Sequence, residues 1–507
     1  MGNGGGGSLT ITLPDSRPVN QFLGIPYAAK PKRFAPARQP DAWTEPRNAS
    51  VFGPSCMQYV ADADAGASSQ LVRDLFATHH QESEDCLFIN AFAPAAKAPA
   101  LRPVVVFIPG GGWQMSNGNL DFTGFAAYED IVAFGFNYRT NVFGFPIADE
   151  IPLKNRNLGL MDQQLALAWV QTNAKAFGGD PEKVTIWGES AGAMSVDIHL
   201  HNYASGRAPF RAAVMSSGQM SFGLLAFTPP ATYTQGWRRL AVAVGCPRGI
   251  IGRLSCMRRV PARDLVDNLD SATFSPYPLA DGKVVPRARA AGWRRGSVAR
   301  VPLLMTTMAE EGRSLLRPNI SLDLFRSAWL PESAVSKDQA ENIFEDYRKM
   351  PGLRNDFDVT SAIYTDWIWQ CPQQMLANAS VALGNPVWRG YINKSLAEVL
   401  PEKYRYLGKF HGADMMLLFF VAARHERGFE MPSHLVRFAR ELRSAIGSFV
   451  RDPRRGPGWP AIGSPSAPRD VAVLGDKSTM IDRNVLDANC AIFTDALAAV
   501  EKKSVAW

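Results

Sequence analysis

Short, uninterrupted apolar runs alternate with helical patterns along this chain. A strand made only of apolar residues is buried on both faces of a sheet, and helices between such strands supply the cover. One helical pattern spans residues 162–177 and ends at Gly178-Gly179-Asp180-Pro181. We therefore predict an α/β fold with a large, mostly parallel central sheet and helices on both faces. The expected strands lie at residues 9–13, 22–26, 104–108, 131–136, 184–187, 212–216, 301–307 and 387–392.

Length, composition and charge narrow the class of protein. The chain has 507 residues, of which 46% are hydrophobic and 20% charged, and this excludes a disordered or collagen-like chain. The net charge is +7, but basic residues are not interleaved with aromatic ones, so we expect no nucleic-acid partner. The longest apolar runs fall well short of the ~20 residues that cross a bilayer. No linker divides the chain, and we expect one domain over residues 1–507 with a helical subdomain at 317–383.

The segment Gly188-Glu189-Ser190-Ala191-Gly192 follows a predicted strand and opens a predicted helix. In that context Gly-x-Ser-x-Gly places a serine on a sharp, strained turn, and the glycines leave room for the backbone around it. The N-terminus of the following helix favours negative charge that develops at the serine. The alternative is a plain strand–turn–helix crossing, because a pattern this short also arises by chance.

A second motif, Pro109-Gly110-Gly111-Gly112-Trp113, directly follows the apolar run at 104–108. Bare backbone N–H groups in such a loop can hold a substrate oxyanion, and losing one donor typically costs about 3–4 kcal/mol of barrier. The alternative is a phosphate-binding loop. No Gly-Lys-[Ser/Thr] follows the glycines and no Gly-x-Gly-x-x-Gly is present, so nucleotide binding is disfavoured and we expect no cofactor.

Together these motifs resemble the type-B carboxylesterases of the cholinesterase/lipase family, whose members have the α/β-hydrolase fold. The resemblance extends over nearly the whole chain, with the motifs in the family's order. Residues 141–146 are most similar to fungal members of the family. The further segments that carry the resemblance lie at residues 22–28, 83–90, 137–139, 162–163 and 177–181.

A serine hydrolase of this fold needs a histidine base, and the order along the chain is Ser…Asp/Glu…His. Of the seven histidines, those at 79 and 80 precede the serine. Those at 199 and 201 follow it too closely and diverge on a helix, which also disfavours a metal pair. His425 and His434 lie in helical, solvated stretches. His411 resembles the family's His-Gly-x-[Asp/Glu] segment, and we predict that it is the base.

The acid is expected between the serine and the histidine, at the end of a strand. The run at 301–307 leads towards Glu310-Glu311-Gly312. The resemblance carries the family's Asp-Glu-Gly acid over to Glu311, with Glu310 at the neighbouring position. The alternative is that both are exposed loop carboxylates, and Asp281 remains a further candidate for the acid.

The resemblance implies a covalent mechanism without a metal or cofactor. His411 takes the proton of Ser190, the serine attacks an ester carbonyl, and water later releases the acyl group. The other residues that the resemblance carries over are oxyanion donors at Gly111, Gly112 and Ala191, and supporting side chains at Glu189 and Ser217.

Six cysteines and four N-x-[ST] sequons favour a secreted glycoprotein. The chain begins without an apolar signal segment, so either it is cytosolic or a leader has been removed. The cysteines and sequons favour a removed leader. The resemblance pairs the cysteines as Cys56–Cys86, Cys246–Cys256 and Cys371–Cys490. The sequon asparagines are Asn48, Asn319, Asn378 and Asn393.

The 56–86 loop contains an apolar helical stripe formed by Leu71, Val72, Leu75 and Phe76. In related lipases this loop is a lid over the pocket, and as a lid it would also contact a lipid interface. The equally weighted alternative is a helix packed permanently on the core.

The resemblance predicts a small-molecule carboxylic ester as substrate, with a short-chain, lipid or sterol, or aromatic acyl group. The 56–86 loop lacks the tryptophan of choline-binding relatives, which disfavours choline esters. Pro109 stands where relatives often have His or Tyr, which alters the approach to the oxyanion donors. The alternative function is acyl transfer or lactone chemistry in a biosynthetic pathway. A non-catalytic binding protein is disfavoured because serine, histidine and acid are all present.

Overall fold

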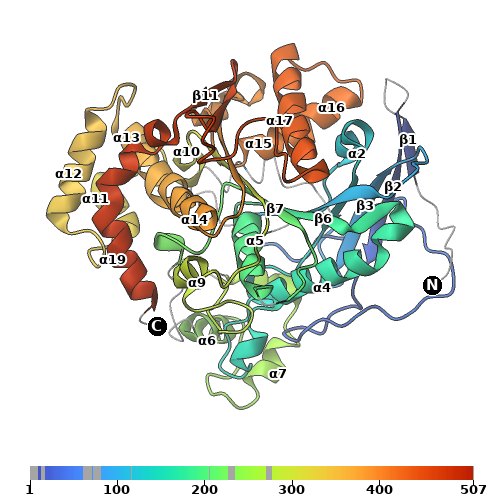
Figure 1. The fold of residues 1–507 in the computed structure, drawn as a ribbon. Helices are drawn as coiled ribbons and strands as arrows, with labels where there is room; N and C mark the ends of the chain where they lie inside the picture. Colours follow the sequence, from blue (N-terminus) through green and yellow to red (C-terminus); the bar gives the residue numbers. More distant parts are fainter. Residues whose placement is uncertain are drawn as a thin grey trace.

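The computed structural model describes residues 9–12, 17–60, 71, 81–115, 117–204, 206–226, 234–269 and 277–505. Their strands form an 11-stranded sheet in the order β1-β2-β3-β5-β4-β6-β7-β8-β9-β10-β11 (Figure 1). Neighbours from β5 to β10 are parallel, and the pairs towards both edges are antiparallel. The predicted mostly parallel sheet is confirmed. The strands are β1 (Leu9–Thr12), β2 (Pro18–Pro26), β3 (Phe88–Pro94), β4 (Arg102–Ile108), β5 (Val132–Phe136), β6 (Gly179–Glu189), β7 (Ala212–Ser216), β8 (Leu303–Met308), β9 (Val387–Asn393), β10 (Val471–Gly475) and β11 (Thr479–Ile481).

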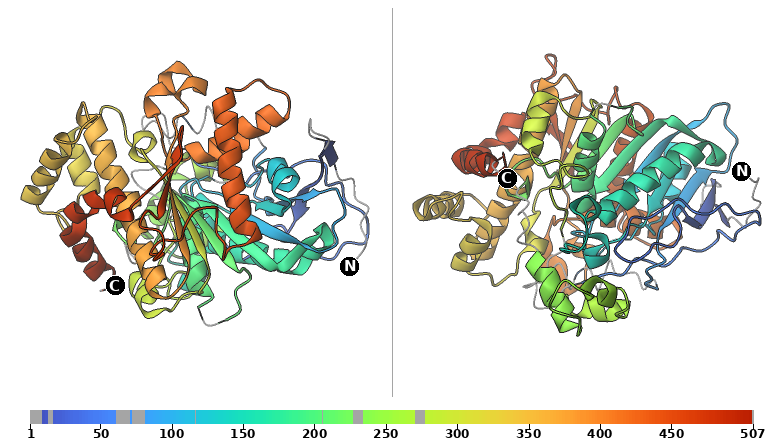
Figure 2. Two further views of the ribbon diagram at one scale, coloured as in Figure 1. Left: turned by 45° about the horizontal axis from the view of Figure 1, so that its top comes forward. Right: turned by 90° about the horizontal axis from the view of Figure 1, so that it is seen from below.

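Helices cover the sheet on both faces, as the apolar strands require (Figures 1 and 2). On β4, Val104 and Val106 join the core that contains α4 and α5, whereas Val105 and Phe107 join the core that contains α2 and α17. Alternate side chains of one strand are thus buried on opposite faces. The longer helices are α2 (Thr123–Glu129), α4 (Leu158–Asn173), α5 (Ala191–Asn202), α6 (Thr234–Ala243), α8 (Ala262–Asp267), α9 (Arg289–Arg295), α11 (Leu322–Trp329), α12 (Lys337–Arg348), α13 (Asp356–Tyr364), α14 (Cys371–Ala382), α17 (Ser433–Arg451) and α19 (Thr494–Val505). The short helices are α3 (Asn141–Gly144), α7 (Arg253–Met257), α10 (Gly312–Leu315), α15 (Ala413–Met416), α16 (Ala422–Glu426) and α18 (Arg483–Leu486).

The sequence pattern identified most strands but not β3, β10 and β11. Asn90 interrupts the apolar run of β3, yet it is fully buried and its amide bonds the carbonyl of Gly118 at 3.2 Å. β11 lies at the edge of the sheet and is only half-buried, so it lacks a continuous apolar run. The helical segment expected at 317–383 contains α11 to α14, which lie together near one end of the sheet (Figure 1).

A buried ion pair ties α4 to the strand end after β5. Arg139 forms two hydrogen bonds of 2.7 Å to the two carboxylate oxygens of Asp162, and both side chains are almost inaccessible. Arg139 also donates to the carbonyl of Ala35 at 2.7 Å. The pair therefore fixes three segments that are distant in the sequence.

We expect Asp162→Ala to lower the free energy of unfolding by about 3–5 kcal/mol, because it leaves the buried guanidinium of Arg139 without its counter-charge. Urea unfolding followed by circular dichroism measures the change. The matched control is Asp41→Ala, which breaks the exposed pair with Arg38 and should leave the unfolding midpoint unchanged. Equal effects of the two substitutions would contradict this account.

Candidate active site

Ser190 occupies the sharp turn between β6 and α5. Its backbone has φ 53° and ψ −125°, which is a strained conformation for a residue with a side chain. A Cβ on Gly192 would lie 2.0 Å from the carbonyl oxygen of Ile108, and one on Gly188 would lie 2.2 Å from the carbonyl carbon of Gly192. The two glycines therefore allow β4, the turn and α5 to approach one another closely enough to present the serine.

His411 lies next to Ser190 although 221 residues separate them. Its Nε2 is 2.8 Å from the Ser190 hydroxyl oxygen, and its Nδ1 is 2.6 Å from a carboxylate oxygen of Glu311. The ring of Trp369, in the π-helical segment Thr365–Gln370, packs against the imidazole with centroids 4.5 Å apart. These contacts fix the orientation of the imidazole between the serine and the carboxylate.

Glu311 is fully buried just beyond β8, and its second carboxylate oxygen accepts the Met308 N–H at 2.8 Å. Glu310, in contrast, accepts the backbone N–H of Lys409 at 2.8 Å. The third carboxylate candidate, Asp281, accepts three backbone N–H groups of its own turn, from Lys283 to Val285. The structure thus brings Glu311 to His411, and it places Glu310 and Asp281 in backbone contacts.

The glycine loop after β4 lies against the serine turn. A Cβ on Gly110 would lie 3.0 Å from the Ser190 Cβ. Gly111 and Gly112 have positive φ of 105° and 61°, and a Cβ on Gly112 would face open space. Among the described residues, the N–H groups of Gly111, Gly112 and Ala191 donate no hydrogen bond within the protein. Three backbone donors near the serine are therefore available to a ligand.

A buried network beneath this loop holds it to two helices. The Ser195 hydroxyl, on α5, donates to the Ala191 carbonyl at 2.8 Å and accepts the indole N–H of Trp113 at 3.1 Å. The Gln163 amide, on α4, donates to the same hydroxyl at 3.2 Å and bonds His199 at 2.8 Å. Burial lowers the pKa of His199 to about 4, so its imidazole is neutral at physiological pH. His199 is thus a neutral, structural member of this network.

Two further carboxyl groups surround the imidazole. Glu189 has a carboxylate oxygen 3.4 Å from the Nε2 of His411, and burial raises its pKa. Burial also raises the pKa of Asp414, three residues after the histidine. Burial lowers the pKa of His411, but the charges of Glu311 and Glu189 and the hydrogen bond that His411 donates to Glu311 outweigh it, so the pKa rises to about 9. The site therefore stabilises a positive charge on this imidazole.

Ser217 lies behind the nucleophile turn at the end of β7. It is fully buried with a positive φ of 48°, and its N–H donates to the Thr306 carbonyl at 2.8 Å. A Cβ on the following Gly218 would lie 2.4 Å from the Ser190 carbonyl oxygen. Ser217 thus shapes the backbone against which the serine turn packs. Sequence reasoning did not single out Trp369, Asp414 or Ser195, although Asp414 stands within the His-Gly-x-[Asp/Glu] segment.

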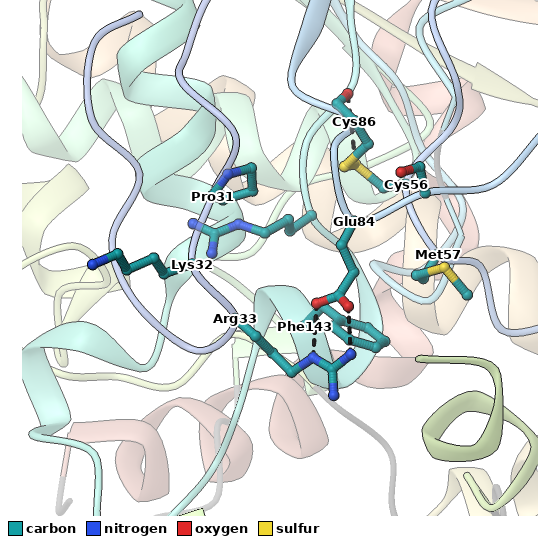
Figure 3. Close-up of a pocket in the computed structure, with 10 residues that line it drawn as sticks. Pro31, Lys32, Arg33, Cys56, Met57, Glu84, Cys86 and Phe143 are labelled. Atoms are coloured by element: carbon teal, nitrogen blue, oxygen red, sulfur yellow. Dashed lines mark hydrogen bonds and ion pairs between the residues drawn. A yellow bond between two sulfur atoms is a disulfide. The ribbon is translucent and has the colours of Figure 1, made fainter. Parts of the chain in front are cut away.

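Three disulfides link Cys56–Cys86, Cys246–Cys256 and Cys371–Cys490, the pairs that the resemblance implies. Figure 3 shows the first of them beside a small pocket, where the Arg33 guanidinium faces the Glu84 carboxylate. Within the 56–86 loop the structure describes 56–60, 71 and 81–86, so most of the predicted lid helix lies outside the described residues; Leu71 is buried.

All four sequon asparagines are exposed. Among the described helices, none is both long and apolar enough to span a membrane.

Known proteins match this chain over most of its length. A family model for the carboxylesterase family matches residues 6–492. Acetylcholinesterase of Electrophorus electricus is 32% identical over 380 residues, which cover 71% of this chain and 57% of that protein. Carboxylesterase 5A of Felis catus is 37% identical over 287 residues, covering 55% of this chain and 51% of that protein. Neuroligin-2 of Homo sapiens is 30% identical over 387 residues, covering 69% and 45%.

The chain thus spans about half the length of these curated relatives. The family model nevertheless covers the strands from β1 to β11, both glycine motifs and the segment around His411. With its large central sheet covered by helices on both faces, the chain belongs to the carboxylesterase family and has the α/β-hydrolase fold.

Proposed function

We propose that this chain is a carboxylic-ester hydrolase that acts through Ser190, His411 and Glu311. The observation that carries the proposal is the continuous row of hydrogen bonds from the Ser190 hydroxyl through the imidazole to the buried Glu311 carboxylate. A serine becomes a nucleophile when a base is within hydrogen-bond reach and a third group orients that base. Membership of the carboxylesterase family supports ester hydrolysis as the reaction.

The proposed reaction has two halves. His411 Nε2 accepts the hydroxyl proton as Ser190 attacks the ester carbonyl, and the resulting imidazolium protonates the departing alcohol. Water, deprotonated by the same imidazole, then attacks the acyl-enzyme and restores the serine. Glu311 holds the imidazole with its Nδ1 proton directed at the carboxylate, and it stabilises the positive charge in both halves.

Oxyanion stabilisation is assigned to the backbone N–H groups of Gly111, Gly112 and Ala191. They flank Ser190 and are without acceptors among the described residues, so no protein contact has to break when the oxyanion forms. Glu189 and Ser217 support this arrangement from behind, through the imidazole and the serine turn respectively.

We propose a small-molecule ester with a short-chain, lipid or sterol, or aromatic acyl group as the substrate. One relative is an acetylcholinesterase by name. The 56–86 loop here contains no tryptophan, and on that ground choline esters are not proposed. We further propose a secreted, glycosylated protein, a lid function for the 56–86 loop and a helical subdomain at 317–383. Three disulfides and exposed sequon asparagines support the first of these.

The function is tested with a panel of p-nitrophenyl esters from acetate to palmitate. Turnover, together with labelling of Ser190 by a p-nitrophenyl phosphonate, is expected because both reactions use the same activated hydroxyl. The profile across chain lengths separates a short-acyl esterase from a lipase. Labelling without turnover would favour acyl transfer to an acceptor other than water, and neither labelling nor turnover would refute the proposal.

The pH dependence of kcat/KM is expected to change when the charge of Glu189 is removed. His411 must be neutral to accept the serine proton, so kcat/KM falls as the pH drops below the pKa of His411. Because the Glu189 charge raises that pKa, we expect Glu189→Gln to shift the acid limb of kcat/KM to lower pH. The control is Glu310→Gln, whose carboxylate bonds the Lys409 backbone. Equal shifts in both variants, or none in Glu189→Gln, would contradict this assignment.

A further inference from the structure

A small lobe beside the sheet carries an unusual concentration of positive charge. It contains α6, α7 and α8, and Figures 1 and 2 show it projecting from the body of the molecule. Residues 234–263 include seven arginines and no aspartate, glutamate or lysine. Asp264 and Asp267 of α8 follow this run and bring the formal net charge of residues 234–267 to +5, against +7 for the entire chain.

The same lobe presents two large aliphatic side chains to solvent. Ile250 is 58% exposed and Ile251 is 89% exposed, the highest exposure among the large apolar residues that the structure describes. They lie between Gly249 and Gly252, at the tip of the loop that the Cys246–Cys256 disulfide closes. Adjacent isoleucines at a loop tip make a protruding apolar point rather than part of a core.

The base of this tip is firmly held. Trp237 is fully buried, and its indole N–H donates to the Glu150 carboxylate at 3.0 Å. Arg253 is 2% exposed and pairs with both Glu150 and Asp149. The disulfide joins the two ends of the loop. The fold therefore holds the isoleucines outward on a fixed support.

Six of the seven arginines of the lobe divide into two groups. Those at 238, 253 and 263 pair with acidic residues of the body or of the lobe. Arg248, Arg258 and Arg259 are exposed, and the described part of the chain offers none of them an acidic partner. The lobe thus combines an apolar tip with exposed arginines. At an anionic lipid surface, apolar side chains insert among the acyl chains and basic side chains contact the negatively charged headgroups.

We propose that the Ile250–Ile251 tip, with Arg248, Arg258 and Arg259, docks the protein on an anionic lipid surface. A second copy of the chain fits the tip poorly, because two tips meeting would bring six like charges together. Arg33 contacts the Glu84 carboxylate (Figure 3). Arg33 also donates to the Met257 carbonyl, and Arg263 contacts Glu82, so the lobe adjoins one end of the 56–86 loop. The proposal does not depend on the proposed hydrolysis.

The test is flotation of the full chain with vesicles of phosphatidylcholine alone and with vesicles that also contain phosphatidylglycerol. The wild type is expected to bind the anionic vesicles, and less so as salt is raised. The double variant Ile250→Ser/Ile251→Ser should weaken that binding by about 100-fold. The triple variant with glutamine at 248, 258 and 259 should weaken it by about 10- to 100-fold. The matched control is Phe429→Ser/Val485→Ser, which removes two other exposed apolar side chains and should bind as wild type does.

Thermal unfolding shows that each variant is folded, and hydrolysis of p-nitrophenyl acetate should be equal in all of them. Absence of hydrolysis would count against the proposed function and leave the flotation result valid. The docking proposal is overturned if the wild type binds neither vesicle, if both vesicles bind equally, or if the isoleucine variant binds as wild type does. Light scattering could instead show that the wild type is a dimer and the isoleucine variant a monomer, with no vesicle binding. That result would assign the tip to a protein contact and would also overturn the docking proposal.

Discussion

Replacing Ser190 by alanine is expected to lower kcat for p-nitrophenyl ester hydrolysis by about 10⁶-fold. The alanine variant loses the atom that bonds His411 at 2.8 Å, so no acyl-enzyme can form. The backbone donors of the glycine loop are retained, and any residual rate above that in water measures their contribution and that of binding. Steady-state kinetics on the best ester of the panel, with active-site titration of the wild type, gives the ratio.

The same position offers a control that separates chemistry from folding. Ser190→Gly removes the hydroxyl as well, but glycine accepts φ 53° and ψ −125° without a Cβ clash. We expect both variants to be inactive and Ser190→Gly to be more stable than Ser190→Ala by about 1 kcal/mol. Retention of activity within tenfold in the alanine variant would exclude Ser190 as the nucleophile.

Local patterns predicted the sheet and the serine turn because their physical requirements are local. The apolar run of β4 is continuous because Val104 and Val105 face different cores. Gly192 stands two residues after the serine because a Cβ there would meet the Ile108 carbonyl. Such local requirements fix the residue types at neighbouring positions, so the resulting pattern can be recognised in a single sequence.

The surroundings of the imidazole depend on contacts between distant segments. His411 is 100 residues from Glu311, and nothing in that separation determines their distance. These two residues were predicted from the order of serine, acid and histidine along the chain and from the family resemblance. Trp369 reaches the imidazole from a π-helical segment whose pattern gives no sign of a functional role. The raised pKa of Asp414 likewise follows from burial, which depends on how the whole chain packs.

The two adjacent glutamates after β8 provide the second large effect. Glu311→Gln is expected to lower kcat by about 10⁴-fold, because the amide NH₂ can face Nδ1 and hold the imidazole in the wrong tautomer. The amide oxygen can still accept the Met308 N–H, so the loop should remain folded. The charge of Glu311 also raises the pKa of His411. Without that charge the imidazole stays neutral at lower pH, so the acid limb of the remaining activity should shift to lower pH. Stopped-flow kinetics across pH on a p-nitrophenyl ester measures both changes.

Glu310→Gln is the matched control, one residue earlier in the chain. A glutamine there can still accept the Lys409 N–H through its amide oxygen, and the side chain makes no contact with His411. We expect kcat within about twofold of wild type, since surface-like substitutions without a buried partner change little. A loss of about 10⁴-fold in this variant, with Glu311→Gln active, would transfer the role of the acid to Glu310. The two residues are of the same type and adjacent in the same loop. A difference in activity between the two glutamine variants can therefore arise only from the direction in which the backbone after β8 points each carboxylate.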